Sequence, residues 1–322
     1  MRPSSGAAAV ERPAVQHDDI VIERLIGLGE RHDAIRAVVL TSTRAAGGSD
    51  LLSDYDVVLY SRDLTCFLER DGWFESFGRV LVMFRDDSGE GGWHARLVLY
   101  EDGTRVDFSV QHIDLLKQAC QANPLPEDLD VGYQVLLDKD GLAASLPPPT
   151  FKAHIPSVPT AKEYATAANE FWWNSIYVAK HLWRDEPMGA HFMLDYGLRH
   201  ERLRVMLEWA IEIERGWSWK PGIYGKGIEK ELDAESRREL ADSYAGADPA
   251  DIWRALFCTA ALFRKTAIKV AAALGYEYPH DLDRRVLAYL HTIQRLDRRT
   301  VSREELAGML REGYAEVASR GR

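Results

Sequence analysis

This sequence of 322 residues contains few cysteines, no long apolar run and no excess of positive charge. The three cysteines, Cys66, Cys120 and Cys258, lie far apart, which excludes a disulfide framework or a zinc-binding spacing and indicates a reducing compartment. No apolar run approaches the roughly 20 residues that a membrane-spanning helix needs. The formal net charge of −10 disfavours broad nucleic-acid binding and is compatible with a cationic substrate. We therefore expect a cytoplasmic protein whose partners include neither a membrane nor a nucleic acid.

The N-terminus also lacks a feature, because MRPSSGAAAVERPAVQHDD contains no apolar core of a secretory signal. We expect residues 1–16 to form a flexible tail. The remaining length is sufficient for one large or two medium domains.

The most informative stretch lies between residues 35 and 60. Two apolar runs, 37–40 and 57–60, are typical of buried strands, and they flank a loop of small and polar residues. Asp54 and Asp56 are two residues apart at the start of the second strand, so both project from the same face. Two carboxylates on one face repel each other unless a cation lies between them, and hard oxygen ligands suit Mg²⁺. A solvated acidic strand end is the alternative interpretation, since an isolated pair of this kind is common.

A third acid, Asp107, lies within the alternating strand RVDFSV. Alternation places Arg105, Asp107 and Ser109 on one face of that strand, opposite Val106 and Phe108. Further strands are predicted at 79–84, 94–100 and 133–137, and Asp102-Gly103 predicts a hairpin turn before the strand at 104–110. Three carboxylates can hold two metal ions about 3.5–4 Å apart for in-line displacement at phosphorus.

A change of pattern follows the proline cluster at 147–149, where we place the boundary between domains 17–150 and 151–322. Apolar residues recur with the helical period over 162–185, and Pro187 fits the first turn of a second helix that ends at Gly216. Asp248-Pro249 begins a long helix that ends at Gly275, and Ser302 to Glu305 is a capping box for the final helix. The second half is therefore a helical bundle, preceded by a helix at 18–31 and a sheet in the first half.

The segments VVLTSTRA, LSDYDVVLY and RVDFSV resemble the nucleotidyltransferase superfamily of the DNA polymerase beta type. In detail they are similar to the aminoglycoside 6-adenylyltransferases, the streptomycin adenylyltransferase family. Segments of the second half resemble the same family in the same order: NEFWWNSIYVAKHLWRDE, MLDYGLR, MLEWAI, YGKGIEKEL and ALGYEYP. The resemblance covers about residues 17–297. One departure is that Ser42-Thr43 stands where the superfamily usually has Gly-Ser.

This resemblance implies an α+β fold, with an N-terminal nucleotidyltransferase domain of mixed sheet and flanking helices and a C-terminal helical domain that binds the acceptor. It implies Mg²⁺ as cofactor, ATP as co-substrate, and an active site between the two domains. Asp54, Asp56 and Asp107 would be the metal ligands and catalytic residues, and Asp107 has the alternative role of accepting a proton. The residues expected at the nucleotide are Ser42, Thr43, Arg44 and Lys226.

The acceptor-binding residues implied by the resemblance lie on the helical domain. Glu170 and Asp195 are the carboxylates expected to face a cationic aminoglycoside, with Trp172 or Trp173 as a stacking wall. Tryptophans at helical spacing are also typical of a core, and Lys226 could equally be an ordinary exposed lysine.

The implied reaction is transfer of AMP to an aminoglycoside hydroxyl group, as in streptomycin resistance, by a monomer. Two other interpretations remain open. One is the same chemistry with another small-molecule or protein hydroxyl as acceptor, and the other is a non-catalytic nucleotide-binding protein.

Overall fold

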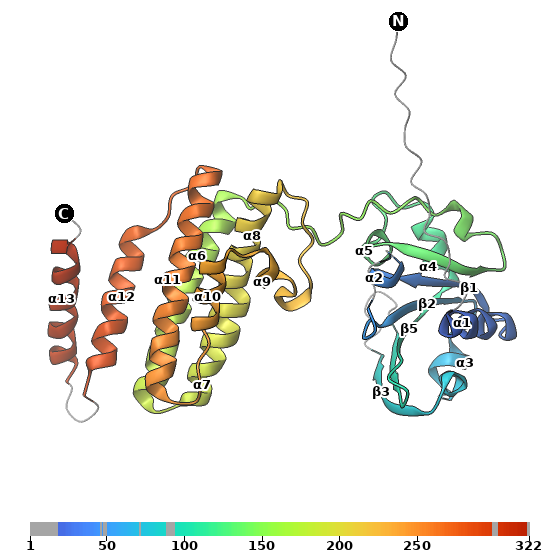
Figure 1. The fold of residues 1–322 in the computed structure, drawn as a ribbon, viewed down its shortest axis with the longest axis horizontal. Helices are drawn as coiled ribbons and strands as arrows, with labels where there is room; N and C mark the ends of the chain where they lie inside the picture. The colour runs from blue at the N-terminus through green and yellow to red at the C-terminus, as the bar shows by residue number, and fades with distance from the viewer. Residues whose placement is uncertain are drawn as a thin grey trace, which may run out of the picture. The chain divides into compact units, whose positions relative to one another are not determined.

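The computed structural model describes residues 19–45, 47, 50–70, 72–87, 94–297 and 302–320. The tail predicted over residues 1–16 lies outside the described residues. The chain divides into two compact units between His154 and Ile155, and each is described separately below (Figure 1). Within the described residues, no helix has the length and apolar character to cross a membrane.

The first unit is built on a mixed sheet. The described residues form six strands in the order β3-β4-β5-β2-β1-β6, and of these neighbours only β2 and β5 run parallel. The predicted strands are all present, with these bounds: β1 (Ile35–Thr41), β2 (Tyr55–Ser61), β3 (Val80–Asp86), β4 (Ala95–Tyr100), β5 (Arg105–His112) and β6 (Tyr133–Asp138).

Both faces of the sheet are covered, which explains the continuous apolar runs in its central strands. Val38 and Leu40 of β1 point into one hydrophobic cluster, whereas Ala37 and Val39 point into another. The first cluster includes α1 (Ile20–Arg31), α3 (Thr65–Leu68) and the 3₁₀ turn η1 (Trp73–Phe77), and the second includes α4 (Ile113–Ala119) and α5 (Glu127–Asp130). The short helix α2 (Ser42–Ala45) follows β1 directly.

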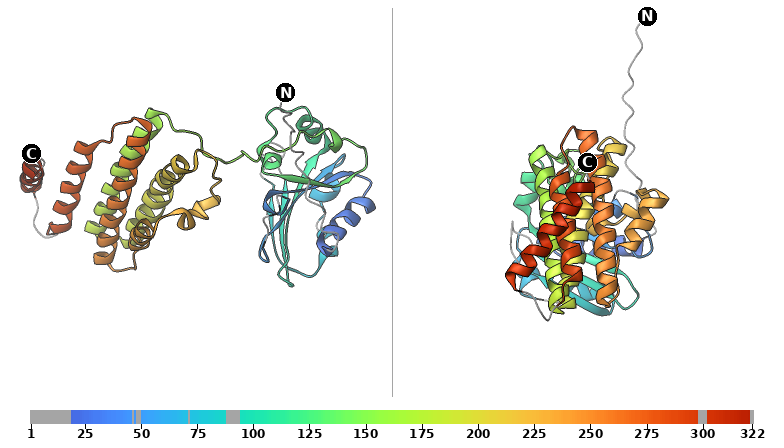
Figure 2. Two further views of the ribbon diagram at one scale, coloured as in Figure 1. Left: turned by 45° about the horizontal axis from the view of Figure 1, so that its top comes forward. Right: turned by 90° about the vertical axis from the view of Figure 1, so that its left-hand side faces the viewer.

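The regular elements described in the second unit are all helices (Figure 2). Its core is one large hydrophobic cluster formed by the inward faces of the longer helices. The bounds are α6 (Ala161–Arg184), α7 (Pro187–Phe192), η4 (Met193–Leu203), α8 (Arg204–Arg215), η5 (Ile223–Gly225), α9 (Ile228–Glu231), α10 (Ala234–Asp242), α11 (Pro249–Leu274), α12 (His280–Arg295) and α13 (Arg303–Arg320).

The predicted helix boundaries are confirmed by the local hydrogen bonds. The Thr160 hydroxyl accepts from the Glu163 backbone N–H at 3.2 Å, a capping box that begins α6. Gly216 and Gly275 end α8 and α11 with φ of +64° and +73°, where glycine is unstrained. The Ser302 backbone N–H donates to the Glu305 carboxylate at 2.9 Å, as the second capping box requires.

One prediction for the second unit is wrong in its detail. The sequence predicts a single α-helix from Pro187 to the cap at Gly216, whereas the structure divides this span into three segments. The middle segment, η4, is a π-helix of 11 residues. Hydrophobic periodicity does not separate an α-helix from a π-helix, and π-helical turns frequently mark functional sites.

Candidate active site

Asp54 and Asp56 lie where the chain enters β2, and Asp107 lies on the neighbouring strand. Asp56 and Asp107 are register partners in the parallel pair of β2 and β5. Adjacent strands are about 4.8 Å apart, so the two carboxylates extend from neighbouring positions on the same face of the sheet. Asp54 precedes Asp56 by two residues and shares that face. The structure therefore brings the three predicted acids together.

Burial and mutual repulsion act on these carboxyl groups. The pKa of Asp56 is raised, mainly because burial removes water, and the nearby charges of Asp107 and Asp54 raise it further. A hydrogen bond from the Ser42 hydroxyl opposes that increase. The pKa of Asp107 is also raised by burial, against the opposing effect of Arg105. Perturbed carboxyl groups of this kind are typical of functional sites.

Arg105 is the closest cation to the three acids among the described ion pairs. Its Nε and Nη2 donate to the two carboxylate oxygens of Asp107 at 2.9 and 2.7 Å. Its Nη1 lies 3.2 Å from Oδ2 of Asp54. Strand alternation in the sequence predicts that Arg105 lies on the same face as Asp107 but indicates no role for it. The signal was available, since residues two apart on a strand are neighbours on one face.

Ser42 has a backbone conformation that is rare for a residue with a side chain. It follows the last residue of β1 with φ of +68°, in the left-handed region that favours glycine. Its backbone N–H donates to the carbonyl of Gly132 at 3.1 Å, and its hydroxyl bonds to Asp56. The backbone thus keeps the conformation of a glycine at the position where the superfamily usually has one. Thr43 follows in α2, and its side chain lies outside the described part of the structure.

Arg44 is bound to protein groups beside the acids. Its Nη2 donates to the carbonyl of Ser53 at 2.7 Å, and its guanidinium lies 3.8 Å from the centre of the Tyr55 ring. The Tyr55 hydroxyl donates to Asp19 at 2.6 Å, and burial, together with this bond, raises the pKa of Tyr55 to about 12. These contacts connect α2 to the start of β2. They place Arg44 beside Asp54, and the phosphate contact expected for it stays a prediction.

The donor chemistry of this site suits a hard divalent cation. Among the described residues, no group of three or more His, Cys, Asp or Glu side chains is arranged to hold a metal ion as the structure stands. The Arg105 guanidinium bonds to both oxygens of Asp107 and approaches Asp54. Three carboxylates that already attract a positive group fit Mg²⁺, which prefers oxygen ligands. The residue types therefore fit the metal, whereas the carboxylates of Asp54 and Asp107 contact Arg105 in this structure.

In the helical unit, the two predicted acceptor carboxylates are paired with arginines. Glu170 lies 2.9 Å from Nη2 of Arg202. Asp195, in the π-helix, lies 2.5 Å from Nη1 of Arg199. Both carboxylates remain nearly half exposed, so each keeps a surface for a ligand.

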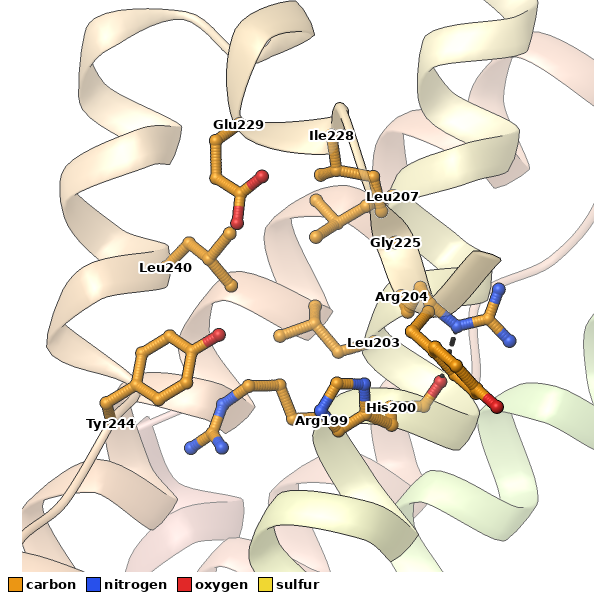
Figure 3. A pocket seen from close by; sticks show the side chains of 11 residues that line it. Arg199, His200, Leu203, Arg204, Leu207, Gly225, Ile228, Glu229, Leu240 and Tyr244 are labelled. Carbon is orange, nitrogen blue, oxygen red and sulfur yellow. Dashed lines mark hydrogen bonds between the residues drawn. The ribbon is translucent and has the colours of Figure 1, made fainter. Parts of the chain in front are cut away.

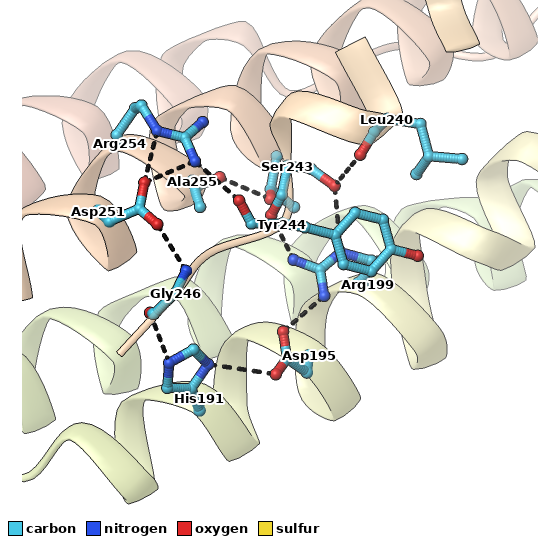
Figure 4. Close-up of polar contacts among 11 residues, drawn as sticks. His191, Asp195, Arg199, Leu240, Ser243, Tyr244, Gly246, Asp251, Arg254 and Ala255 are labelled. Atoms are coloured by element: carbon cyan, nitrogen blue, oxygen red, sulfur yellow. Dashed lines mark hydrogen bonds and ion pairs between the residues drawn. The ribbon is translucent and has the colours of Figure 1, made fainter. Parts of the chain in front are cut away.

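Asp195 belongs to a wider network of polar contacts (Figure 4). His191 bonds to Asp195 through Nδ1 at 3.3 Å and to the carbonyl of Gly246 through Nε2 at 3.0 Å. The buried Arg199 also donates to Ser243, and its guanidinium lies 4.1 Å from the centre of the Tyr244 ring. This network ties the π-helix to the loop after α10.

The prediction of a stacking wall is wrong for Trp172. Its side chain is fully buried, and its ring makes an edge contact with Phe171 at 5.2 Å inside the core. A buried indole cannot offer a face to a ligand. Trp173, the next residue, is 61% exposed and contacts Tyr177 at 6.2 Å between ring centres, so it alone of the pair can stack on a solute.

A groove lies beside η4 in the same unit (Figure 3). Its empty volume, counted together with space that is open to solvent, is about 350 Å³. Its polar lining includes Arg199, Arg204, Glu229 and Tyr244, while Lys226 lies in the neighbouring loop with an exposed side chain. Arg204 is already paired with Glu208 at 2.7 Å. The groove thus combines apolar walls with polar groups that are largely satisfied by other residues.

Comparisons with known proteins give matches across both units. A family model described as streptomycin adenylyltransferase matches residues 16–293. The aminoglycoside 6-adenylyltransferase of Bacillus subtilis (strain 168) is 31% identical over 269 residues, which are 81% of this chain and 92% of that protein. The aminoglycoside 6-adenylyltransferase of Campylobacter jejuni is 26% identical over 80% of this chain and 90% of its own length. The crystal structure of an aminoglycoside 6-adenyltransferase from Bacillus subtilis is 28% identical, covers 86% of this chain and 97% of its own, and has a TM-score of 0.44.

Proposed function

Because the chain belongs to the streptomycin adenylyltransferase family of nucleotidyltransferases, we propose that it transfers AMP from ATP to a hydroxyl group of a streptomycin-like aminoglycoside and releases pyrophosphate. This activity would confer resistance to the antibiotic. The observation that carries the proposal is the register of Asp56 with Asp107, which sets two carboxylates side by side with Asp54 on the same face. The net charge of −10 also suits a polycationic acceptor.

The metal in this proposal is Mg²⁺, held by Asp54, Asp56 and Asp107. When bound, it would supply positive charge against the phosphates of ATP. The Ser42 hydroxyl orients the Asp56 carboxylate through its hydrogen bond. Arg44 fixes the turn of α2 against the start of β2, which keeps the acids at a constant spacing. Most of the rate enhancement would come from such positioning and from charge neutralisation.

Asp107 is our candidate for the group that accepts the proton of the attacking hydroxyl. Burial raises its pKa toward the range in which a carboxylate is a better base. Thr43 and Lys226 are proposed to contact the nucleotide phosphates, on the basis of the family resemblance and the exposure of Lys226. Glu170, Asp195 and Trp173 are proposed to bind the acceptor, since two carboxylates and an exposed indole suit a cationic sugar.

The direct test is pyrophosphate release with ATP and Mg²⁺, measured against streptomycin and a panel of other aminoglycosides. Asp56→Asn should lower the rate about 10³-fold or more, since the variant removes a charge that positions the reacting phosphate. Asp114→Asn is the matched control, because Asp114 is an exposed acid on α4 of the same unit that pairs with Lys117 at 2.7 Å. The control should retain full activity, and circular dichroism should give the same spectrum for both variants.

Near-normal turnover of Asp56→Asn would contradict the assignment of the acids. ATP binding without release for any aminoglycoside would contradict the acceptor and favour another small-molecule or protein hydroxyl. Absence of ATP binding would contradict adenylyl transfer itself.

A further inference from the structure

Arg105 and the acids around it form a compact charge cluster in the first unit. Arg105 is the first residue of β5, and its fork of N–H groups spans from Asp107 on its own strand to Asp54, which directly precedes β2. The guanidinium uses both oxygens of Asp107 and approaches one oxygen of Asp54. Those oxygens are the ones that a divalent cation would need. A guanidinium and a metal ion cannot bond to the same carboxylate lone pairs, and their like charges repel.

We propose that Arg105 is the internal counter-ion of this site and competes with the divalent metal for Asp54 and Asp107. In the metal-free protein the arginine neutralises carboxylates that would otherwise repel each other. Metal binding then requires the fork to leave Asp107. The inference rests on the metal site of the proposed function and adds a residue that controls how tightly the metal binds.

The contacts of Arg105 suit a group that is displaced rather than one that holds the fold together. Its side chain is 43% exposed, and its pairs are therefore weakened by solvent. It carries four rotatable bonds and lies at the end of a strand, so it can swing away without moving the backbone. Asp56 has its own partner in the Ser42 hydroxyl and no ion pair to Arg105 among the described contacts. A metal ion can therefore contact Asp56 while Arg105 is still bound to Asp107.

The experiment measures Mn²⁺ binding to the full chain without ATP, by the loss of the free-ion signal in electron paramagnetic resonance. Arg105→Met and Arg105→Gln remove the charge with similar length, so either one can serve if the other folds poorly. We expect both to bind Mn²⁺ about tenfold more tightly than the unaltered protein. Arg105→Lys keeps the charge without the fork and should give an intermediate affinity.

The matched control is Arg62→Met, which removes one positive charge from the same unit. Arg62 follows the other end of β2 and pairs with Asp140 at 2.9 Å. It should leave Mn²⁺ affinity unchanged. A second readout is thermal unfolding, in which Arg105→Met should lower the Tm in EDTA, and Mn²⁺ should raise the Tm of Arg105→Met by more than it raises that of the unaltered protein. An effect that comes only from lost packing would leave the two increases equal.

The outcomes separate this inference from the proposed function. Mn²⁺ binding by the unaltered protein with equal or weaker affinity in both Arg105→Met and Arg105→Gln would overturn the role of Arg105 and leave the metal site intact. Binding that appears only when Arg105 is neutralised would support the competition strongly. Absence of binding in every variant would overturn the metal site of the proposed function, and the competition with it.

Discussion

The positive φ angle of Ser42 places a strained residue next to the candidate catalytic acid Asp56. A φ of +68° costs a residue with a Cβ about 1–2 kcal/mol relative to glycine. Such strain persists where the surrounding structure holds it, and it concentrates at functional sites. Here the Gly132 carbonyl holds the backbone, and the hydroxyl gains a hydrogen bond to the half-buried Asp56. The strained serine therefore contributes a contact that a glycine could not make.

Two variants of Ser42 separate strain from the hydroxyl. Both Ser42→Gly and Ser42→Ala lose the hydroxyl, but only glycine relieves the backbone. We expect Ser42→Gly to be more stable than Ser42→Ala by about 1 kcal/mol, measured by urea unfolding. This order is the reverse of the usual helical preference for alanine. Equal stability, or a more stable alanine variant, would show that the residue does not hold the left-handed conformation in solution.

At the scale of one element, α6 has two chemically different sides. Consecutive residues on a helix are about 100° apart, so Trp172 faces the core while Trp173 faces solvent. The inward side also contains Phe171, which stacks on Phe263 at 3.7 Å between ring centres. One helix thus contributes aromatic packing to the core of its unit and an exposed ring, Trp173, which we propose for the acceptor.

The two tryptophans should respond oppositely to removal. Trp172→Ala creates a core cavity and should lower the free energy of unfolding by about 3–5 kcal/mol. Trp173→Ala should change it by less than about 0.5 kcal/mol and raise the KM for the aminoglycoside. Denaturant unfolding and steady-state kinetics of both variants provide the test. An unchanged KM in Trp173→Ala would remove that residue from the acceptor site.

A charged cluster ties three segments of the sheet together at the end distant from the acids. Asp140, just after β6, accepts from Nε of Arg36 in β1 at 2.8 Å and from Arg62 after β2 at 2.9 Å. These bonds lower the pKa of Asp140 from 3.8 to about 2. A carboxyl group with a lowered folded-state pKa stabilises the protein above its unfolded pKa, and that contribution disappears as pH falls through the folded value.

Asp140→Asn should therefore be less stable than the unaltered protein at pH 7. The difference should shrink as the pH falls from about 4 to about 2, where the carboxylate becomes protonated in both states. Thermal unfolding across this pH range measures the effect. A difference that is constant with pH would mean that the charge of Asp140 does not contribute.

For the whole molecule, the important feature is that each unit has hydrophobic clusters of its own. The clusters of the first unit lie on the two faces of the sheet, and the cluster of the second lies among its helices. Units with separate cores can unfold as separate cooperative blocks.

Calorimetry should resolve two unfolding transitions. ATP with Mg²⁺ at about 100 times its Kd should stabilise the transition of the first unit by about 2.7 kcal/mol. Trp172→Ala identifies the other transition, because it should lower the unfolding temperature of the helical unit alone. A single calorimetric transition whose temperature shifts both with ATP and Mg²⁺ and with Trp172→Ala would contradict independent unfolding.

Much of the fold could be predicted because it depends on local patterns. Period-2 alternation located the strand of Asp107, and glycine caps and capping boxes located the helix ends. Strand alternation also places Arg105 beside Asp107, but the contact of Arg105 with Asp54 and the packing of Arg44 could not be predicted in this way. Arg105 reaches Asp54, which is distant in sequence, and Arg44 packs on Tyr55. A side chain of that length has several possible partners, and only the folded sheet selects one.

By itself, the sequence determined the family, the order of the strands along the chain and the ends of several long helices, and it singled out the three acids as candidates. These features follow from residue type and short-range spacing, which are properties of the chain before it folds. Only the tertiary structure decided that Asp56 and Asp107 are register partners, that Arg105 lies among the acids, and that Trp172 is buried while Trp173 is exposed. Strand pairing and core packing bring together residues that the chain separates, and the competition among those long-range contacts is settled only when the chain is folded.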